Sequence, residues 1–338
     1  MLSCKPKRTK KETSTINDAA PTDLVSGCGT QDLEFFIRMS ASDLSSRALF
    51  LEGGENCVVM LHGLGANALE LQRLAKYLHE TGFTVVVPTI EGYTYGTEIQ
   101  EWPVWLEQVL DHIWKLEKEY ASVSLVGLSM GAVLAMVAAQ RHPRTLAGLV
   151  LLSTSLAYDG WSMPWYRGLL AISAWLPFVK NYRLKESEPF GVKNEEIRAS
   201  IKAALKSQDI TESGVGEIGY GLIKQGQYLI REARENARWI ECPTLVIHAV
   251  DDEIVHIRNA EWVYREIRAE EKEMIYLGDS YHMITIDNER DTVNQETARF
   301  LKKSVNQQLE KPAFEVAPIK SSHLRRLLRK IQSQVFQI

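Results

Sequence analysis

The sequence predicts an α/β protein built on a mostly parallel central sheet with helices on both faces. The first observation is that short β-branched apolar runs alternate with longer segments whose apolar residues recur at helical spacing. Such alternation produces parallel strands joined by crossover helices. The second observation is that the alternation stops after the fourth such strand, between residues 155 and 241, and then resumes. An interruption of this kind predicts a helical cap inserted at the edge of the sheet.

Strand and helix signals precede the interruption in regular order. Before Glu52, the stretches EFFIRM and RALFLE predict an opening antiparallel pair of strands. The parallel strands that follow are expected at Cys57–Leu61, Thr84–Pro88, Ser122–Val126 and Leu146–Leu152. The helices between them are expected at Asn67–His79, Glu98–Tyr120 and Met130–Arg141. The last of these helices stops before Pro143, which cannot continue a helix.

The chain after residue 155 completes the predicted organisation. The interruption is aromatic and helical in pattern, with NEEIRASIKAAL and YLIREARENARWI as helix signals. Two more strands, TLVIHAV and KEMIYL, then alternate with helices at Asn259–Arg268 and Asp291–Lys303. The sequence thus divides into a flexible polar leader (1–31), a core (32–154 and 242–304), a helical cap (155–241), and a linker followed by a basic amphipathic helix (305–338).

Composition narrows the classes of function. With 338 residues, 45% hydrophobic and 24% charged, the chain can bury a substantial core. A formal net charge of −4 gives no reason to expect a nucleic-acid partner. The four cysteines lack the close pairing of metal or redox sites, and Cys57 and Cys242 are interpreted as small buried side chains. Nothing implies a cofactor.

The N-terminal segment carries no secretory signal. Residues 1–15 are basic and polar, and the apolar segment of a signal peptide does not follow them. Since the sequence also lacks a run of about 20 apolar residues, a cytoplasmic location is expected. The basic run KPKRTKK is interpreted as a solvated tail, with a nuclear or lipid address as the alternative.

A reactive serine is the main chemical prediction. Gly127-Leu128-Ser129-Met130-Gly131 directly follows a predicted strand and opens a predicted helix. Glycines on either side let strand and helix pass close together, while the turn strains the serine backbone and exposes its hydroxyl. A serine that only caps the helix is the alternative.

A serine hydroxyl needs a base, and the base needs an orienting carboxylate. Both candidates lie in loops after late strands: Asp251 or Asp252 after TLVIHAV, and His282 after KEMIYL. The carboxyl ends of parallel strands meet at one edge of the sheet, so these side chains should converge on Ser129. His256 is a weaker candidate base because it follows the acid loop itself.

From about Val58 to Leu301 the chain resembles the α/β-hydrolase superfamily, and within it the small bacterial carboxylesterases and monoacylglycerol lipases. By this resemblance Ala249–Val255 matches the acid loop G/A-x-x-D-x-x-V and places the acid at Asp252, with Asp251 as a turn residue. His282 matches the family's catalytic histidine. The resemblance also implies that the H-G-x-x-G loop from His62 supplies half of an oxyanion hole, with the backbone N–H groups of Leu64 and Met130 as donors and His62 orienting the loop.

The expected activity is hydrolysis of a small-molecule carboxylic ester or lipid ester through an acyl-enzyme. The same triad could instead cleave a thioester or a carbon–carbon bond or transfer an acyl group, and a non-catalytic binding protein on the same scaffold is the alternative from another class. The cap aromatics either line an apolar acyl pocket or pack the cap onto the sheet. They are Trp161, Trp165, Tyr166, Trp175, Phe178 and Tyr182.

The C-terminal tail departs from the resemblance. Lys311–Lys320 contains two prolines and is interpreted as a linker. Leucine, isoleucine and valine then recur at helical spacing from Leu324 to Val335, with arginine and lysine between them. This amphipathic helix is expected either to make a peripheral contact with an anionic membrane or to dock on the protein's own acidic surface or a second subunit. No pattern indicates an oligomeric state.

Overall fold

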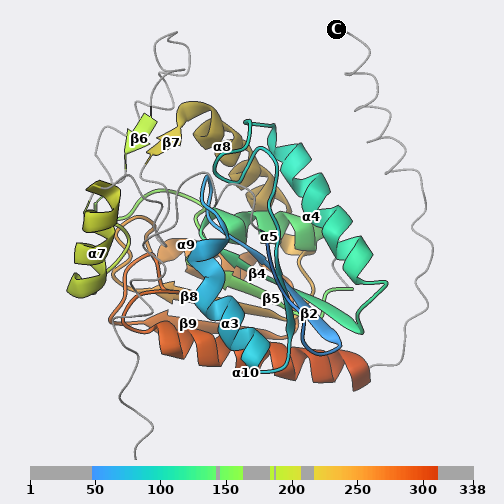
Figure 1. The fold of residues 1–338 in the computed structure, drawn as a ribbon. Coiled ribbons are helices and arrows are strands. Elements are labelled where there is room, and N and C mark those ends of the chain that lie inside the picture. Colours follow the sequence, from blue (N-terminus) through green and yellow to red (C-terminus); the bar gives the residue numbers. More distant parts are fainter. Residues whose placement is uncertain (1–47, 142–144, 163–182, 186–187, 207–216, 311–338) are drawn as a thin grey trace, which may run out of the picture.

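The computed structural model describes residues 48–141, 145–162, 183–185, 188–206 and 217–310 (Figure 1). Its centre is a seven-stranded sheet with the order β1-β3-β2-β4-β5-β8-β9. The strands are β1 (Leu49–Leu51), β2 (Asn56–Leu61), β3 (Thr84–Val87), β4 (Ser122–Leu128), β5 (Leu149–Leu152), β8 (Thr244–Ala249) and β9 (Lys272–Leu277). All neighbours are parallel except β1 and β3, so the mostly parallel sheet is confirmed.

The opening strands differ in part from the prediction. RALFLE contains β1, which runs antiparallel to β3 with Leu49 opposite Val87. The other predicted member of that pair, EFFIRM, lies outside the described residues, as does the leader 1–31. The antiparallel partner of β1 within the described ranges is thus a strand that follows it along the chain.

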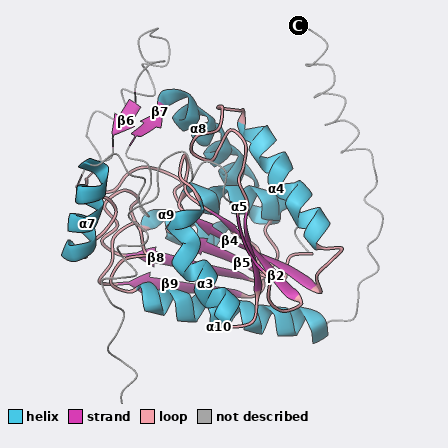
Figure 2. Cartoon of the chain, viewed as in Figure 1, coloured by secondary structure: helices cyan, strands magenta, loops and turns pink. Residues whose placement is uncertain are grey.

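Helices cover both faces of the sheet in two layers (Figure 2). One face packs against α3 (Gln72–Glu80) and α10 (Arg290–Glu310), and the other against α4 (Trp102–Leu116), α5 (Met130–Arg141), α8 (Tyr220–Asn236) and α9 (Arg258–Glu266). Side chains alternate between the two cores along each strand, as the pleat requires: Leu125 packs with α5, whereas Val126 packs toward α10. The strands are therefore buried on both sides, which explains their continuous apolar runs.

Several helix boundaries differ from the prediction; α4, for example, ends at Leu116 and not at Tyr120. Two of the differences have a clear structural reason. Helix α4 begins at Trp102, not Glu98, because Pro103 favours the first turn of a helix, where its missing N–H costs no hydrogen bond. Helix α10 runs to Glu310, so residues 305–310 belong to a core helix and not to the predicted linker. Val305 is buried against the sheet, which explains why the helix continues. The remainder of the tail, 311–338, lies outside the described residues.

The cap segment, residues 155–241, connects the neighbouring strands β5 and β8. Its described part holds α7 (Glu195–Lys206), α8 and a short antiparallel pair, β6 (Arg183–Lys185) with β7 (Glu217–Gly219), which the sequence did not predict. Helix α8 joins the layer of α4 and α5 on one face of the sheet. Of the cap aromatics, Trp161 is described; Trp165, Tyr166, Trp175, Phe178 and Tyr182 lie outside the described residues.

Two cysteines fall within the described ranges, and both are buried as predicted. Cys57 on β2 and Cys242 before β8 are 1% and 2% exposed and form no disulfide. Burial raises the pKa of each thiol to about 12, so both stay protonated. Across the described part of the chain, none of the helices has the length and apolar character needed to cross a lipid bilayer.

Candidate active site

Ser129 lies in the sharp turn between β4 and α5. Its φ of 57° is in the left-handed region, which L-residues with a side chain rarely adopt. The turn is held because Ser129 N–H donates to the carbonyl of Leu152 at 2.8 Å. A Cβ on Gly131 would lie 2.1 Å from the carbonyl oxygen of Leu61, so only glycine lets α5 start this close to β2. The side chain of Ser129 remains partly exposed.

Ser129 and His282 are joined directly. Ser129 Oγ lies 2.9 Å from His282 Nε2, and His282 Nδ1 lies 2.7 Å from Asp252 Oδ2. The structure therefore brings the three predicted residues into one hydrogen-bonded chain from the ends of β4, β8 and β9. His282 and Asp252 are both buried at 3% exposure, which protects their contact from water.

The electrostatics of this pair favour an oriented base. Burial pushes the pKa of His282 down, but the charge and hydrogen bond of Asp252, together with the charges of Glu253 and Glu70, raise that pKa above its ordinary value. Burial alone would raise the pKa of Asp252, yet the charge and hydrogen bond of His282 hold it below its ordinary value. Asp252 is therefore ionised at neutral pH and fixes the proton of His282 on Nδ1, leaving Nε2 as an acceptor.

The acid loop separates the two candidate aspartates. Asp252 Oδ1 accepts from the amides of Ile254 and Val255 at 2.9 and 2.8 Å, which turns the other oxygen toward His282. Asp251 points to the surface, where Lys193 lies 3.3 Å from its carboxylate. His256, the weaker candidate base, is exposed, and its Nδ1 accepts from the amide of Arg258 at 3.2 Å.

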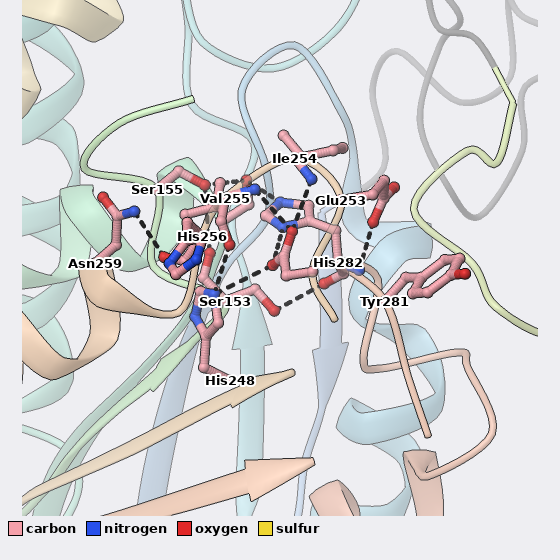
Figure 3. Close-up of polar contacts among 12 residues, drawn as sticks. Ser153, Ser155, His248, Glu253, Ile254, Val255, His256, Asn259, Tyr281 and His282 are labelled. Carbon is pink, nitrogen blue, oxygen red and sulfur yellow. Dashed lines mark hydrogen bonds and ion pairs between the residues drawn. The ribbon is translucent and has the colours of Figure 1, made fainter. Parts of the chain in front are cut away.

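Two further titratable residues around His282 escaped the sequence reasoning (Figure 3). His248, on β8, lies 3.3 Å from Asp252 Oδ2 and 2.9 Å from the carbonyl of Val255. Burial lowers the pKa of His248 against the pull of Asp252, so its ring is neutral at neutral pH. Glu253 is 1% exposed, and its Oε2 accepts from His282 N–H at 3.2 Å. Burial raises the pKa of Glu253 to about 7.

Hydrogen bonds fix the backbone of His282 on both sides. Ser153, after β5, donates its hydroxyl to the His282 carbonyl at 2.7 Å, as Figure 3 shows. The buried carboxylate of Asp287 accepts from four amides, those of Lys193, Asn194, Tyr281 and Asn288. Met283 N–H adds a bond to Gly191 O at 2.7 Å. The histidine loop is thereby tied both to β5 and to residues 191–194 of the cap segment.

The side chains of Leu64 and Met130, the two residues predicted to supply the oxyanion amides, pack against the same glycine of α8. A Cβ on Gly226 of α8 would meet Leu64 Cδ2 at 3.1 Å and Met130 Cε at 3.3 Å, so these two side chains converge under α8. Met130 opens α5, where the amides of the first turn lack partners within the helix. Among the described residues, neither the Leu64 amide nor the Met130 amide has a recorded hydrogen-bond acceptor. Both amides are thus free to bind an anion.

The loop before Leu64 is held by a buried polar network. His62 contacts the carbonyl of Gly63 through Nδ1 at 2.8 Å and Thr94 Oγ1 through Nε2 at 3.0 Å. Burial lowers the pKa of His62 to about 4, so the ring is neutral and orients the loop without carrying charge. Glu70 accepts from Gly63 N–H at 2.7 Å and fixes the other side of the same residue.

The arrangement matches the chemistry of acyl transfer. It contains a partly exposed serine hydroxyl, a histidine within hydrogen-bond reach of it, a buried carboxylate that orients the histidine, and the amide of Met130 directly after the serine. Within the described ranges, no group of three or more histidine, cysteine, aspartate or glutamate side chains is placed to hold a metal ion.

Comparison with known proteins places the chain in a family. The family described as "Serine aminopeptidase, S33" (Hydrolase_4) matches residues 54–291. A carboxylesterase of Bacillus subtilis (strain 168) is 29% identical over 256 residues, covering 75% of this chain and 94% of that protein. A thermostable monoacylglycerol lipase of Bacillus sp. (strain H-257) is 23% identical over 257 residues, covering 75% of this chain and 93% of the lipase.

Solved structures agree in fold. The structure described for the metagenome-derived lipolytic enzymes LipS and LipT has a TM-score of 0.65 at 24% identity and covers 77% of this chain and 98% of its own. A soluble variant of monoglyceride lipase from Saccharomyces cerevisiae has a TM-score of 0.64 at 16% identity, covering 76% of this chain and 91% of its own. At such identities the likeness concerns the fold alone. The extent of the family match shows that this chain belongs to the Hydrolase_4 (serine aminopeptidase, S33) family of the α/β-hydrolase superfamily.

Proposed function

We propose that this protein is a serine hydrolase that cleaves carboxylic esters through an acyl-enzyme. The observation that carries the proposal is the hydrogen-bonded chain from Ser129 Oγ through His282 to Asp252. The similarity of the chain to a carboxylesterase and to a monoacylglycerol lipase also supports the proposal. A scaffold that only binds a ligand has no physical need of a strained serine aligned with a buried histidine and carboxylate.

Each residue has a defined role in the proposed reaction. Ser129 Oγ attacks the ester carbonyl while His282 Nε2 takes its proton, and Asp252 stabilises the imidazolium that forms. The amides of Leu64 and Met130 bind the developing alkoxide, an interaction completed only in the tetrahedral intermediate. His282 then protonates the leaving alcohol, and a water molecule repeats the attack to release the acid.

We infer that the acyl group is a medium or long apolar chain. The inference is supported by the apolar surroundings of the oxyanion amides, where Leu64 and Met130 pack under α8 and Leu222 lies near Gly65. With a series of p-nitrophenyl esters, kcat/KM should rise from acetyl toward longer chains. A steady fall from acetyl onward would contradict the inference while leaving the proposed ester hydrolysis intact.

The proposed function is tested by labelling with a fluorophosphonate probe alongside p-nitrophenyl ester hydrolysis. The wild type should be labelled and active, and Ser129→Ala should lose labelling and at least about 10³-fold in kcat. Ser200→Ala is a matched control because this serine is partly exposed on α7 and donates to the carbonyl of Glu196 in its own helix. Ser129→Ala with His282→Ala should be no worse than either single variant, since members of one catalytic unit do not add. A labelled and active Ser129→Ala variant would overturn the assignment.

A further inference from the structure

A second buried hydroxyl touches the proposed nucleophile. Ser155 Oγ lies 3.0 Å from Ser129 Oγ, and the side chain of Ser155 is fully buried at 0% exposure. It stands in the loop after β5, and its amide faces the carbonyl of Ser129 at 3.5 Å. The chemistry described above gives Ser155 no role.

The direction of this hydrogen bond follows from counting protons. The single proton of Ser129 is directed to His282 Nε2, 2.9 Å away, because Nδ1 already donates to Asp252. Ser129 Oγ therefore has lone pairs but no second proton for Ser155. Ser155 has one proton and two acceptors within reach, Ser129 Oγ at 3.0 Å and the carbonyl of Ser153 at 3.3 Å. The shorter contact makes Ser155 the donor to Ser129.

We propose that Ser155 is a further catalytic residue of the proposed hydrolase, donating a hydrogen bond to Ser129 Oγ. The proposal rests on the proposed function. As Ser129 Oγ forms its bond to the ester carbon, its proton passes to His282 Nε2 and the carbonyl π pair moves to the carbonyl oxygen. Negative charge that builds on Oγ before that bond is complete is stabilised by the Ser155 hydroxyl, which keeps its own proton throughout.

The same donor acts again when the acyl-enzyme breaks down. Water adds to the acyl carbon and its proton passes to His282; the bond from that carbon to Ser129 Oγ then breaks, and Oγ takes the proton back from His282. While Oγ is esterified it is a poorer acceptor, and Ser155 can turn to the carbonyl of Ser153. Its buried hydroxyl therefore has a partner in both states, which avoids the cost of an unsatisfied donor.

The experiment compares Ser155→Ala with Thr154→Val. Thr154 is the preceding residue, equally buried, and among the described residues its hydroxyl has no hydrogen-bond partner. Each variant removes one buried hydroxyl from the same loop, but only Ser155→Ala removes a contact with Ser129. Ser155→Ala should lower kcat/KM for a soluble p-nitrophenyl ester, and the rate of fluorophosphonate labelling, by about 10-fold. Thr154→Val should stay within about two-fold of the wild type.

Two further measurements distinguish a catalytic role of Ser155 from a purely structural one. In the pH profile of kcat/KM, the midpoint assigned to His282 should be the same in Ser155→Ala as in the wild type, because the contact of His282 with Asp252 is intact. The variant Ser155→Thr keeps the hydroxyl and should recover most of the rate. A rate that stays within two-fold or rises in Ser155→Ala overturns the proposal, as does an equal loss in Thr154→Val or a displaced midpoint. If the wild type is active and Ser155→Ala is equally active, only the inference about Ser155 is wrong. If the wild type is inactive and unlabelled, the proposed function is wrong as well.

Discussion

The turn that carries Ser129 and the two loops that carry Asp252 and His282 are positioned by different physical means. Around Ser129 the constraints are mainly steric: a left-handed φ, and a glycine at 131 packed against the backbone of β2. Around His282 the constraints are polar and distant in sequence, because Ser153 and Glu253 bond its backbone from other strand ends. Substitutions should therefore fail in different ways on the two sides, through shape at the turn and through charge and hydrogen bonding at the loops.

The largest expected effect on activity comes from the polar contacts around His282. Asp252→Asn should lower kcat by about 10⁴-fold, because an amide no longer fixes the proton of His282 on Nδ1 or stabilises the imidazolium. Asp251→Asn is the matched control, since this exposed carboxylate only pairs with Lys193 at the surface. Steady-state kinetics on a p-nitrophenyl ester would measure both. A large loss in Asp251→Asn with little in Asp252→Asn would move the acid to the neighbouring residue.

On the steric side, Gly131→Ala should lower kcat/KM by about 100-fold and also reduce the melting temperature. The added methyl would lie 2.1 Å from Leu61 O, so α5 or β2 must shift and carry Ser129 with it. Gly278→Ala, in the loop after β9, is the control because a Cβ there meets no atom within 4 Å. If both variants keep wild-type kinetics and stability, the turn is not held by close packing.

A smaller, pH-dependent effect should mark Glu253. Its pKa rises from 4.5 to about 7 on folding because the side chain is buried. The folded state then binds more protons than the unfolded state between these values, so this group's contribution to stability falls as pH rises from 4.5 to 7. Glu253→Gln should abolish this fall, which amounts to about 3 kcal/mol in the free energy of unfolding.

Denaturant unfolding at pH 4.5 and pH 8 would measure that difference, with Glu235→Gln on the exposed face of α8 as control. Because ionised Glu253 raises the pKa of His282, the midpoint of the acidic limb of the activity profile, where His282 loses its proton, should also move to lower pH in Glu253→Gln. Parallel pH dependence in wild type and Glu253→Gln would show that the carboxylate titrates normally in the folded protein.

The same contrast explains what the sequence could predict. The turn at Ser129 was placed correctly because its requirements, an apolar strand, two glycines and a helix, are all adjacent in the chain. Asp252 and His282 were brought near Ser129 by the rule that parallel strands end at one edge of the sheet. Their catalytic roles stay predictions.

Residues whose role depends on partners far along the chain were missed. Ser153 and Ser155 follow β5 as polar residues after a fully apolar strand, the same signal that pointed to Asp252 and His282. His248 lies inside β8, where sequence spacing alone does not reveal its contact with Asp252. The strands β6 and β7 are three residues each and pair across the cap segment, which leaves too little periodicity to detect.

The four hydrogen bonds to Asp287 have a mechanical consequence. Two come from Lys193 and Asn194 in the cap segment and one comes from Tyr281, next to His282. The cap segment and the loop that carries His282 are therefore bound to the same carboxylate. Displacing residues 193–194 outward must either break a buried carboxylate away from its amides or pull His282 from Ser129. The position of His282 is therefore coupled to that of residues 193 and 194 in the cap segment through one buried carboxylate.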